Sequence, residues 1–550
     1  MRIKLAALLL AALLLAGCGP RHYRDSADRE VTAAIAGKTP LVPNLGTNLS
    51  IATNLPVELA SLPKNELPEE AFGTNAQAEV GAVIISLEKA LEIAVKQSRT
   101  YQTRKETLYL QALALTLARH RYQPIFSGSA EAQHLTTHEI QTGVDGIVEE
   151  RSVRVDGRAG MNVLLRTGAR LVTSFSTDFL RFLTGDPRLT TSSALAANLA
   201  QPLLKGAGYR VATENLTQAE RDLLYALRDF SRFRKDFATD IAAAYYGVLQ
   251  NRDAARNNWR GFQNFRLNVE REKAFAEEGR RSLTSLGQLK QAELNTETRW
   301  ITSTRNYFQS LDAFKILLGL PLNTRITLDD RELANLRIIH PTLQLEEAVT
   351  VAHATRLDLQ NRRDSVEDAA RKVMVAGNNL KPRLDLVAGV QAPQQGGAKL
   401  APDFERYSWH AGLDAELPFD RKAERNSYRA ALIAEARAAR EYALAKDQIR
   451  LEIVEGWRNL DQAKRNYEIS ELGVQLSQQR VEEETLKQEL GRGLARDLVD
   501  AQTDLINSKN ARTSALINHN LARLRFWRDM GILMIKDDGN WETLADAQSN

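Results

Sequence analysis

Few residues in this chain of 550 have the types and the spacing that catalysis or metal binding requires. The sequence contains no Walker-type phosphate loop, no His-Glu-x-x-His pair, no Gly-x-Ser-x-Gly elbow and no pair of cysteines. It therefore lacks a recognisable means of hydrolysing a nucleotide, holding a catalytic metal or forming an acyl-enzyme. His134 and His138 are four residues apart, but they fall where we expect a strand and a loop rather than one helix face. We predict no enzyme activity, no metal and no cofactor.

The one cysteine, Cys18, is the residue best placed for covalent chemistry. Arg2 and Lys4 precede a run of apolar residues, 5–16, which suits a secretory signal but is too short to span a bilayer. Residues 15–18, Leu-Ala-Gly-Cys, have the form of a bacterial lipobox, in which cleavage before the cysteine is followed by its acylation. We predict that Cys18 carries lipid and that Gly19 after it directs the protein to the outer membrane. The alternative is a leftover thiol in an ordinary signal peptide.

The charge balance and the hydropathy of the chain exclude further classes of function. Lys and Arg number 73 against 69 Asp and Glu, and the opposite charges are interspersed, so no basic face argues for nucleic acid. After the signal no stretch reaches 18 apolar residues. If the mature chain crosses a membrane, it must therefore use strands closed into a barrel.

An internal repeat organises the chain. Leu87-Glu88-Lys89-Ala90 aligns with Leu345-Glu346-Glu347-Ala348 at an offset of 258, and the same offset pairs Pro124 with Pro382 without a gap. Each copy begins as an amphipathic helix that ends at its proline. We predict two tandem copies of one structural unit.

After each proline the period of the pattern changes from 3.6 to 2, which predicts strands with one apolar face. The predicted strands lie at 126–133, 195–199, 384–391 and 409–417, four per chain. The face of Trp409, Leu413 and Leu417 opposes a face with Asp414 and Glu416, as lipid outside and water inside would require. A soluble sheet packed on its own helices would alternate in the same way. A further alternating segment near 161–182 we interpret as an extended surface hairpin.

Two proline-free runs of about 75 residues, 208–283 and 419–490, carry apolar residues at spacings of three and four. At 1.5 Å per residue each helix would reach about 110 Å. Glycine-containing tips at 279–287 and 491–497 then reverse the chain, and a returning helix follows each, through 292–318 and 501–530. Asp497, Asp500 and Asp504 share one face of the second returning helix.

The order and duplication of these elements, together with the lipobox, resemble the TolC or outer-membrane efflux protein family. The likeness covers about residues 86–534. Family-like segments are Gln-Pro-Leu-Leu-Lys-Gly at 201–206, Ala244-Tyr245-Tyr246 with Leu249, echoed by Trp457 and Leu460, and Arg356-Leu357-Asp358-Leu359. The first tip, longer than the second by about one helical turn, and the long segment 19–85 depart from the family pattern.

The resemblance implies a mainly α fold with a β-barrel portion. Long antiparallel α-helical hairpins would form a periplasmic α-barrel, and a homotrimer would share an outer-membrane barrel of 12 strands. It implies a passive exit duct of a tripartite efflux or type I secretion system in the Gram-negative outer membrane, anchored at Cys18. Its partners would be a periplasmic adaptor, an inner-membrane transporter and outer-membrane lipid, with no nucleic acid.

The resemblance also assigns roles to the tips. The residues expected to contact the adaptor are Gly279, Thr284, Gly287, Gly491, Gly493 and Leu494. The candidates for lining or gating the pore are Asp497, Asp500, Asp504, Arg492 and Arg496, and an ordinary solvated helix face is the alternative.

The expected organisation is a signal peptide at 1–17, a lipidated and irregular tether at 18–85, a first repeat at 86–320, a connector at 321–344, a second repeat at 345–534 and a polar tail at 535–550. Two other functional classes stay open, a periplasmic adaptor and a structural coiled-coil lipoprotein. The adaptor would need one hairpin flanked by lipoyl-like domains, and the coiled coil would have no use for alternating strands.

Overall fold

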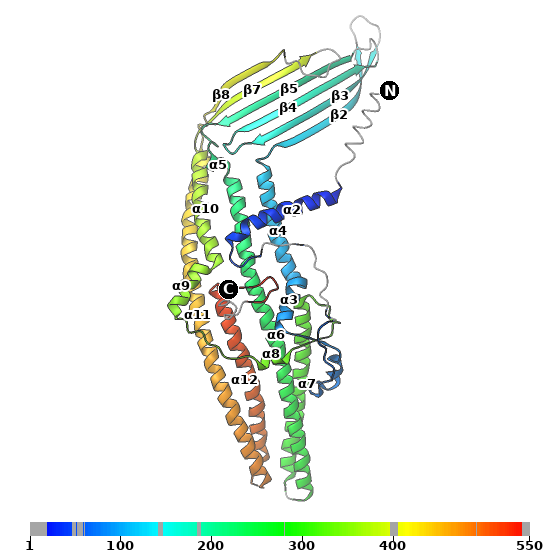
Figure 1. Ribbon diagram of the computed structural model, residues 1–550, viewed down its shortest axis with the longest axis vertical. Helices are drawn as coiled ribbons and strands as arrows, with labels where there is room; N and C mark the ends of the chain where they lie inside the picture. Colours follow the sequence, from blue (N-terminus) through cyan, green and yellow to red (C-terminus); the bar gives the residue numbers. More distant parts are fainter. Residues whose placement is uncertain are drawn as a thin grey trace. The chain divides into compact units, whose positions relative to one another are not determined.

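The computed structural model describes residues 19–46, 51, 59, 61–140, 147–183, 189–279, 281–395, 405–490 and 492–541. The predicted signal peptide, Cys18, Gly491 and residues 542–550 lie outside the described residues. The chain is mainly helical with one large sheet, as predicted (Figure 1). It divides into two compact units, one of residues 1–38, 110–226 and 362–442, the other of residues 39–109, 227–361 and 443–550.

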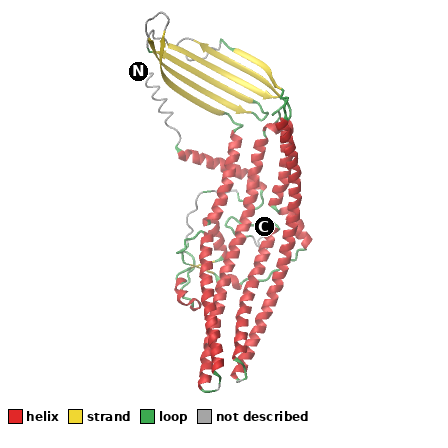
Figure 2. Cartoon of the chain, turned by 180° about the vertical axis from the view of Figure 1, so that it is seen from behind, coloured by secondary structure: helices red, strands yellow, loops and turns green. Residues whose placement is uncertain are grey.

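The first unit contains an antiparallel sheet, drawn in yellow in Figure 2. Its six strands follow the order β2-β3-β4-β5-β7-β8. The strands are β2 Ile125–Ile140, β3 Ile147–Leu164, β4 Arg170–Phe182, β5 Leu189–Pro202, β7 Arg383–Gln395 and β8 Ser408–Glu416. The four predicted strands are all present in β2, β5, β7 and β8, except that Leu417, predicted to lie in the last strand, follows the end of β8.

The expectation of a surface hairpin near 161–182, and with it the count of four strands, is wrong. β3 and β4 form a hairpin that lies inside the sheet, where β3 pairs with β2 along its length and β4 pairs with β5. The turn between them uses Gly168 at φ 93°, a conformation that glycine adopts without strain. Arg154 and Arg158 lie on the polar face of β3 and alternate with Val155 and Ala159, so β3 has the period of two of its neighbours, which the sequence prediction overlooked.

The turn that leaves β5 explains the Gln-Pro-Leu-Leu-Lys-Gly segment at 201–206. The Leu203 amide donates to the Leu384 carbonyl at 2.8 Å, and the Gly206 amide donates to Oδ1 of Asn378 at 2.7 Å. Gly206 itself has φ 80°. The segment therefore turns the chain out of the sheet while its backbone groups keep their partners.

A cluster of ion pairs follows that turn in the first unit. Arg221 and Arg371 both reach the buried carboxylate of Asp368, each at 2.9 Å. The Tyr225 hydroxyl donates to the same carboxylate at 2.7 Å. The cluster joins the start of α6 (Glu214–Glu277) to α10 (Leu357–Asn379).

The remaining helices and the two short strands complete the chain. They are α2 Pro20–Lys38, α3 Leu87–Gln97, α4 Arg99–His120, α5 Tyr209–Ala212, α7 Leu283–Leu318, α8 Asp330–Ala334, α9 Leu345–Thr355, α11 Lys422–Glu489 and α12 Ala495–Asp529, with β1 Val83–Ile85 parallel to β6 Ile326–Leu328. Within the described part of the chain, no helix combines the length and the apolarity needed to cross a membrane.

Several predicted boundaries shift. The single helix expected from Leu87 to the proline is two helices, because Ser98 has an extended backbone at ψ 126° and ends α3. Arg356 breaks α9 from α10 in the same way. The returning helices begin earlier than predicted, at Leu283 and Ala495, so the longer first tip is an extra turn of α7.

Residues 18–85 are not irregular throughout, contrary to expectation. Residues 20–38 form the helix α2, and residues 61–85 pack into the second unit through the buried side chains of Phe72 and Glu79. Phe72 stacks on Tyr307 of α7 with ring centroids 5.0 Å apart. The prolines of this segment suggested irregular structure, because the contacts that order it are made with residues more than 150 positions away.

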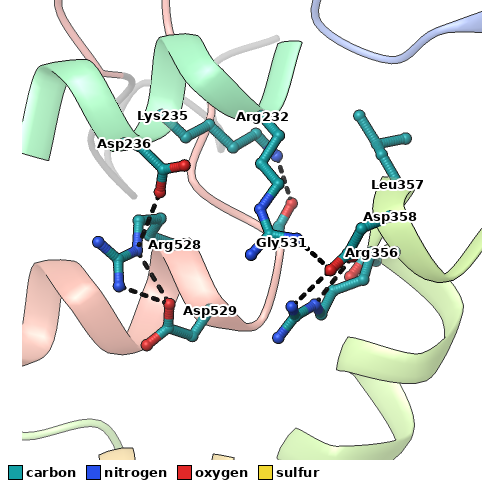
Figure 3. Close-up of a pocket in the computed structure, with 10 residues that line it drawn as sticks. Arg232, Lys235, Asp236, Arg356, Leu357, Asp358, Arg528, Asp529 and Gly531 are labelled. Atoms are coloured by element: carbon teal, nitrogen blue, oxygen red, sulfur yellow. Dashed lines mark hydrogen bonds and ion pairs between the residues drawn. The ribbon is translucent and has the colours of Figure 1, made fainter. Parts of the chain in front are cut away.

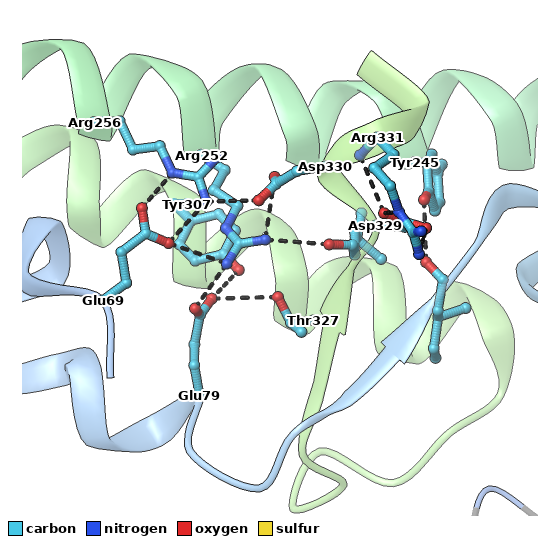
Figure 4. A network of polar contacts seen from close by, with 12 residues as sticks. Glu69, Glu79, Tyr245, Arg252, Arg256, Tyr307, Thr327, Asp329, Asp330 and Arg331 are labelled. Atoms are coloured by element: carbon cyan, nitrogen blue, oxygen red, sulfur yellow. Dashed lines mark hydrogen bonds and ion pairs between the residues drawn. The ribbon is translucent and has the colours of Figure 1, made fainter. Parts of the chain in front are cut away.

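A buried polar network fastens this segment (Figure 4). Nη2 of Arg252 lies 2.9 Å from Oε2 of Glu79, and its Nη1 donates to the Leu328 carbonyl at 3.1 Å. Tyr307 also donates to Glu79. Burial raises the pKa of Glu79 above its ordinary value although Arg252 lies beside it. The carboxylate therefore depends on this guanidinium for its charge.

We expect Arg252→Met to lower the free energy of unfolding by about 3–5 kcal/mol, because it leaves a buried carboxylate without its countercharge. The double variant Arg252→Met, Glu79→Met should recover part of that loss. The matched control is Arg331→Met, whose side chain is 81% exposed beside Asp329 and whose substitution should leave the free energy of unfolding nearly unchanged. Thermal denaturation of the three variants measures this, and equal losses for Arg252 and Arg331 would contradict it.

Candidate functional site

The register of the sheet sorts its side chains onto two faces that differ sharply in polarity. One face carries Phe126, Ala132, Val155, Phe175, Leu195, Val390, Trp409 and Leu413, which the strand pairings place on the same side. We call this the apolar face. The opposite, polar face carries Ser127, Glu131, Arg154, Asp178, Arg383, Asp414 and Glu416. The predicted opposition of Trp409 and Leu413 to Asp414 and Glu416 is confirmed.

Most of the apolar face is exposed, although Val163 and Ala392 on the same side are buried. Phe126 is 76% exposed, Trp409 71% and Leu413 65%, and Leu195, Leu386 and Val390 are exposed as well. Soluble proteins rarely leave a contiguous apolar surface of this extent in water. A soluble sheet packed through its apolar face on the helices of its own chain, the alternative reading of the alternation, would bury these side chains.

Ion pairs across neighbouring strands organise the polar face. Arg154 of β3 contacts Asp178 of β4 at 2.6 Å and Asp156 at 3.1 Å. Arg383 of β7 contacts Asp385 at 2.8 Å and lies 3.6 Å from Asp414 of β8. The inserted hairpin thus has the same two faces as the strands that the sequence analysis identified.

The two tips lie in the second unit and use different turns. Gly279 has φ 71°, and Ser282 caps α7 by accepting from the amide of Ser285 at 3.2 Å. Thr284 and Gly287, predicted to be tip residues, therefore lie in the first turns of α7. At the second tip Gly493 is buried against the backbone of Gln488, where a Cβ would lie 2.8 Å from an amide nitrogen. Leu494 is 67% exposed.

Arg281, which the sequence analysis did not single out, ties the tips together. Its Nη2 donates to the Gln488 carbonyl at 2.8 Å, and its Nη1 donates to the Gly493 carbonyl at 3.2 Å. Buried Glu272 lies beside it, 4.0 Å from its Nε, and accepts from Gln488 at 3.2 Å. No sequence pattern marks Arg281, because the two carbonyls to which it donates belong to residues more than 200 positions away.

Between the tips, α7 and α12 line a groove of about 770 Å³. It brings together four of the predicted tip and gating residues, Thr284, Gly287, Arg496 and Asp500. Arg496 lies 3.9 Å from Asp500 on its own helix, and Asp504 pairs with Arg480 of α11 at 2.7 Å. Arg492 follows α11 with its amide bonded to the Lys487 carbonyl, and Asp497 lies in the first turn of α12.

The Arg-Leu-Asp-Leu segment at 356–359 lines a separate, charged cavity of about 110 Å³ in the second unit (Figure 3). Arg356 contacts Asp358 at 2.6 Å, and Arg528 contacts Asp529 at 2.8 Å. Lys235 donates to the Gly531 carbonyl at 2.6 Å, and burial lowers its pKa to about 8. These charged side chains have partners within the protein and connect neighbouring helices. We therefore assign the cavity no ligand.

We expect Arg281→Ala to loosen both tips, because it leaves the Gln488 and Gly493 carbonyls without their donor and removes the guanidinium beside the buried Glu272, at a local cost of about 1–3 kcal/mol. Amide hydrogen exchange of residues 484–496 should accelerate. Arg496→Ala is the matched control, since its side chain is 79% exposed and its ion pair is worth less than about 1 kcal/mol. Unchanged exchange in Arg281→Ala would show that the tips hold together by other contacts.

Comparison with known proteins gives one consistent result. No protein-family model and no curated protein matches the sequence. Among solved structures, the outer membrane protein VceC of Vibrio cholerae shares 16% identity, covering 84% of this chain and 99% of that chain at a TM-score of 0.60. The outer membrane channel CmeC of Campylobacter jejuni shares 13% identity, covering 92% and 97% at 0.60. The outer membrane channel MtrE of Neisseria gonorrhoeae shares 12%, covering 81% and 89% at 0.57. The chain therefore has the fold of these outer-membrane channels.

Proposed function

We propose that the protein is the outer-membrane exit duct of a tripartite efflux or type I secretion system. It acts as a passive homotrimeric conduit and not as an enzyme. The observation that carries the proposal is the two-faced sheet, whose exposed apolar face suits lipid and whose ion-paired polar face suits a water-filled lumen. The fold shared with outer-membrane channels supports it.

Lipid at Cys18 and partners at the tips belong to the same proposal. The lipobox supports acylation of Cys18, which palmitate labelling of the wild type and of Cys18→Ser tests. The exposed side chain of Leu494 beside the groove between α7 and α12 offers a periplasmic adaptor an apolar contact. An inner-membrane transporter would then supply the cargo through the adaptor.

The direct test is to purify the protein from outer-membrane fractions and add it to planar bilayers. We expect a heat-modifiable trimer and discrete conductance steps. A periplasmic adaptor or a structural coiled-coil lipoprotein would give neither, so a protein that enters bilayers without conductance would overturn the proposal.

The faces of the sheet make a sharper prediction. Leu413→Arg should impair assembly into the membrane, because a charge on the lipid face at midplane depth costs about 2–4 kcal/mol. Asp414→Arg, one residue along on the polar face, is the matched control and should assemble. The yield of heat-modifiable trimer in the outer membrane compares the two. Equal yields would mean that the apolar face does not meet lipid.

A further prediction concerns the acidic residues of the second tip. If Asp497 and Asp500 line the pore, each occurs three times in the trimer, and Asp497→Asn with Asp500→Asn should reduce the preference for cations. The effect should be largest at low salt, because exposed charges are screened over about 10 Å at 0.1 M. Asp461→Asn, which removes a similar pair with Arg465 of α11, is the control. Single-channel recordings with the same selectivity in all three proteins would remove these aspartates from the pore.

A further inference from the structure

The sheet ends in two strands whose outer edges have no partner among the described strands. β2 pairs only with β3, and β8 pairs only with β7. Unpaired edges present rows of amide and carbonyl groups to the surroundings. In a membrane each unsatisfied group costs several kcal/mol, so both edges require another strand.

The directions of the strands suit a second copy of this chain. All five pairings in the sheet are antiparallel, so in a set of six the edge strands β2 and β8 run in opposite directions. β8 of one copy laid against β2 of the next therefore continues the antiparallel pattern. An odd number of strands would bring parallel edges together instead.

The ends of the strands show a regular stagger. The line of paired residues that starts at Ile125, the first residue of β2, runs through Asn162, Val172, Asn198, Gly389 and His410. Asn162 lies two residues before the end of β3, and Asn198 lies four before the end of β5. His410 lies six residues before the end of β8 at Glu416. The strand ends therefore advance by about one residue per strand.

This stagger has the size that a closed sheet requires. With about 3.3 Å per residue and about 4.8 Å between strands, one residue per strand corresponds to a tilt of roughly 35–40°. Strands in closed barrels tilt by about 35–45°. Placing Ile125 of the next copy level with Glu416 continues the same advance.

That placement also keeps both faces intact. With Ile125 opposite Glu416, Ser127 faces Asp414 on the polar face, and Ala130 faces Ala411 on the apolar face. A slip of one residue would turn every side chain of β2 to the wrong face. In this register, the apolar and polar residues of β2 and β8 therefore lie on the correct faces of the sheet.

We propose that three copies close into a single sheet of 18 strands through this β8–β2 contact, with β3 and β4 as part of its wall. The inference rests on the proposed trimeric conduit and departs from the 12 strands that the family resemblance implies. At the tilt above, 18 strands give a backbone diameter of about 35 Å, against about 23 Å for 12. Barrels of 16–18 strands leave an aqueous channel, so this end of the duct would admit larger hydrated cargo.

The test pairs cysteines across the proposed contact. Ala130→Cys with Ala411→Cys should form covalent trimers on oxidation, because facing residues of neighbouring strands have Cα atoms about 4.5–5.5 Å apart, within disulfide reach. Ala130→Cys with His410→Cys, which point to opposite faces, and each single variant are the controls and should stay monomeric on denaturing gels. An intramolecular disulfide or no disulfide would overturn the contact.

Electron microscopy of the purified protein gives an independent reading of the strand number. A ring of about 35 Å at the sheet end supports 18 strands, and one of about 23 Å overturns them. Conducting trimers with the smaller ring and no crosslink would refute this inference and leave the conduit intact. A protein that forms no trimer and does not conduct would refute both.

Discussion

Satisfying the backbone hydrogen bonds of the six-stranded sheet is the constraint on which the rest of the structure depends. Most of its apolar face is exposed, and among the described strands each edge strand is paired on one side only. Such a sheet is costly in water, because an exposed apolar surface and open edges both promote association. Lipid on the apolar face, water on the polar face and further strands at both edges would remove both costs together. The alternation of Leu413 with Asp414 places an apolar side chain on one face and a charged side chain on the other.

The long helices meet a different constraint, since helices of 64 and 68 residues cannot be stabilised by propensity alone. Their stability comes from packing along their length. Phe265 of α6, Ala292 of α7 and Ile506 of α12 form a buried cluster, and Gly261 makes room for Ile506 where a Cβ would overlap it. Asn257 and Asn510 join α6 to α12 by a hydrogen bond of 2.9 Å. At the tips, Arg281 donates to the Gln488 and Gly493 carbonyls, and Glu272 accepts from the side chain of Gln488.

The parts that could be predicted from the sequence are those whose cause is local. Helical periodicity located the long helices, and alternation located the greater part of four strands, because each residue's environment repeats over short distances. Leu87 and Leu345, aligned at an offset of 258, are the first residues of α3 and α9. The break at Ser98 was missed because a single extended residue hardly disturbs an apolar pattern. Arg252, Glu79 and Arg281 were missed because their roles arise from partners that are remote in sequence.

The inserted hairpin shows why an error in strand count leaves the remaining topology intact. β3 leaves β2 and β4 returns to β5, so the chain re-enters the sheet at the same end and in the same direction as it would with a direct connection from β2 to β5. An insertion of one strand would reverse the direction of β5 and would make the two edges parallel. Two strands are thus the smallest addition that widens the sheet and preserves the antiparallel relation of β2 and β8. Because the alternation of Val155 with Arg154 continues that of the neighbouring strands, the added pair extends both faces without interruption.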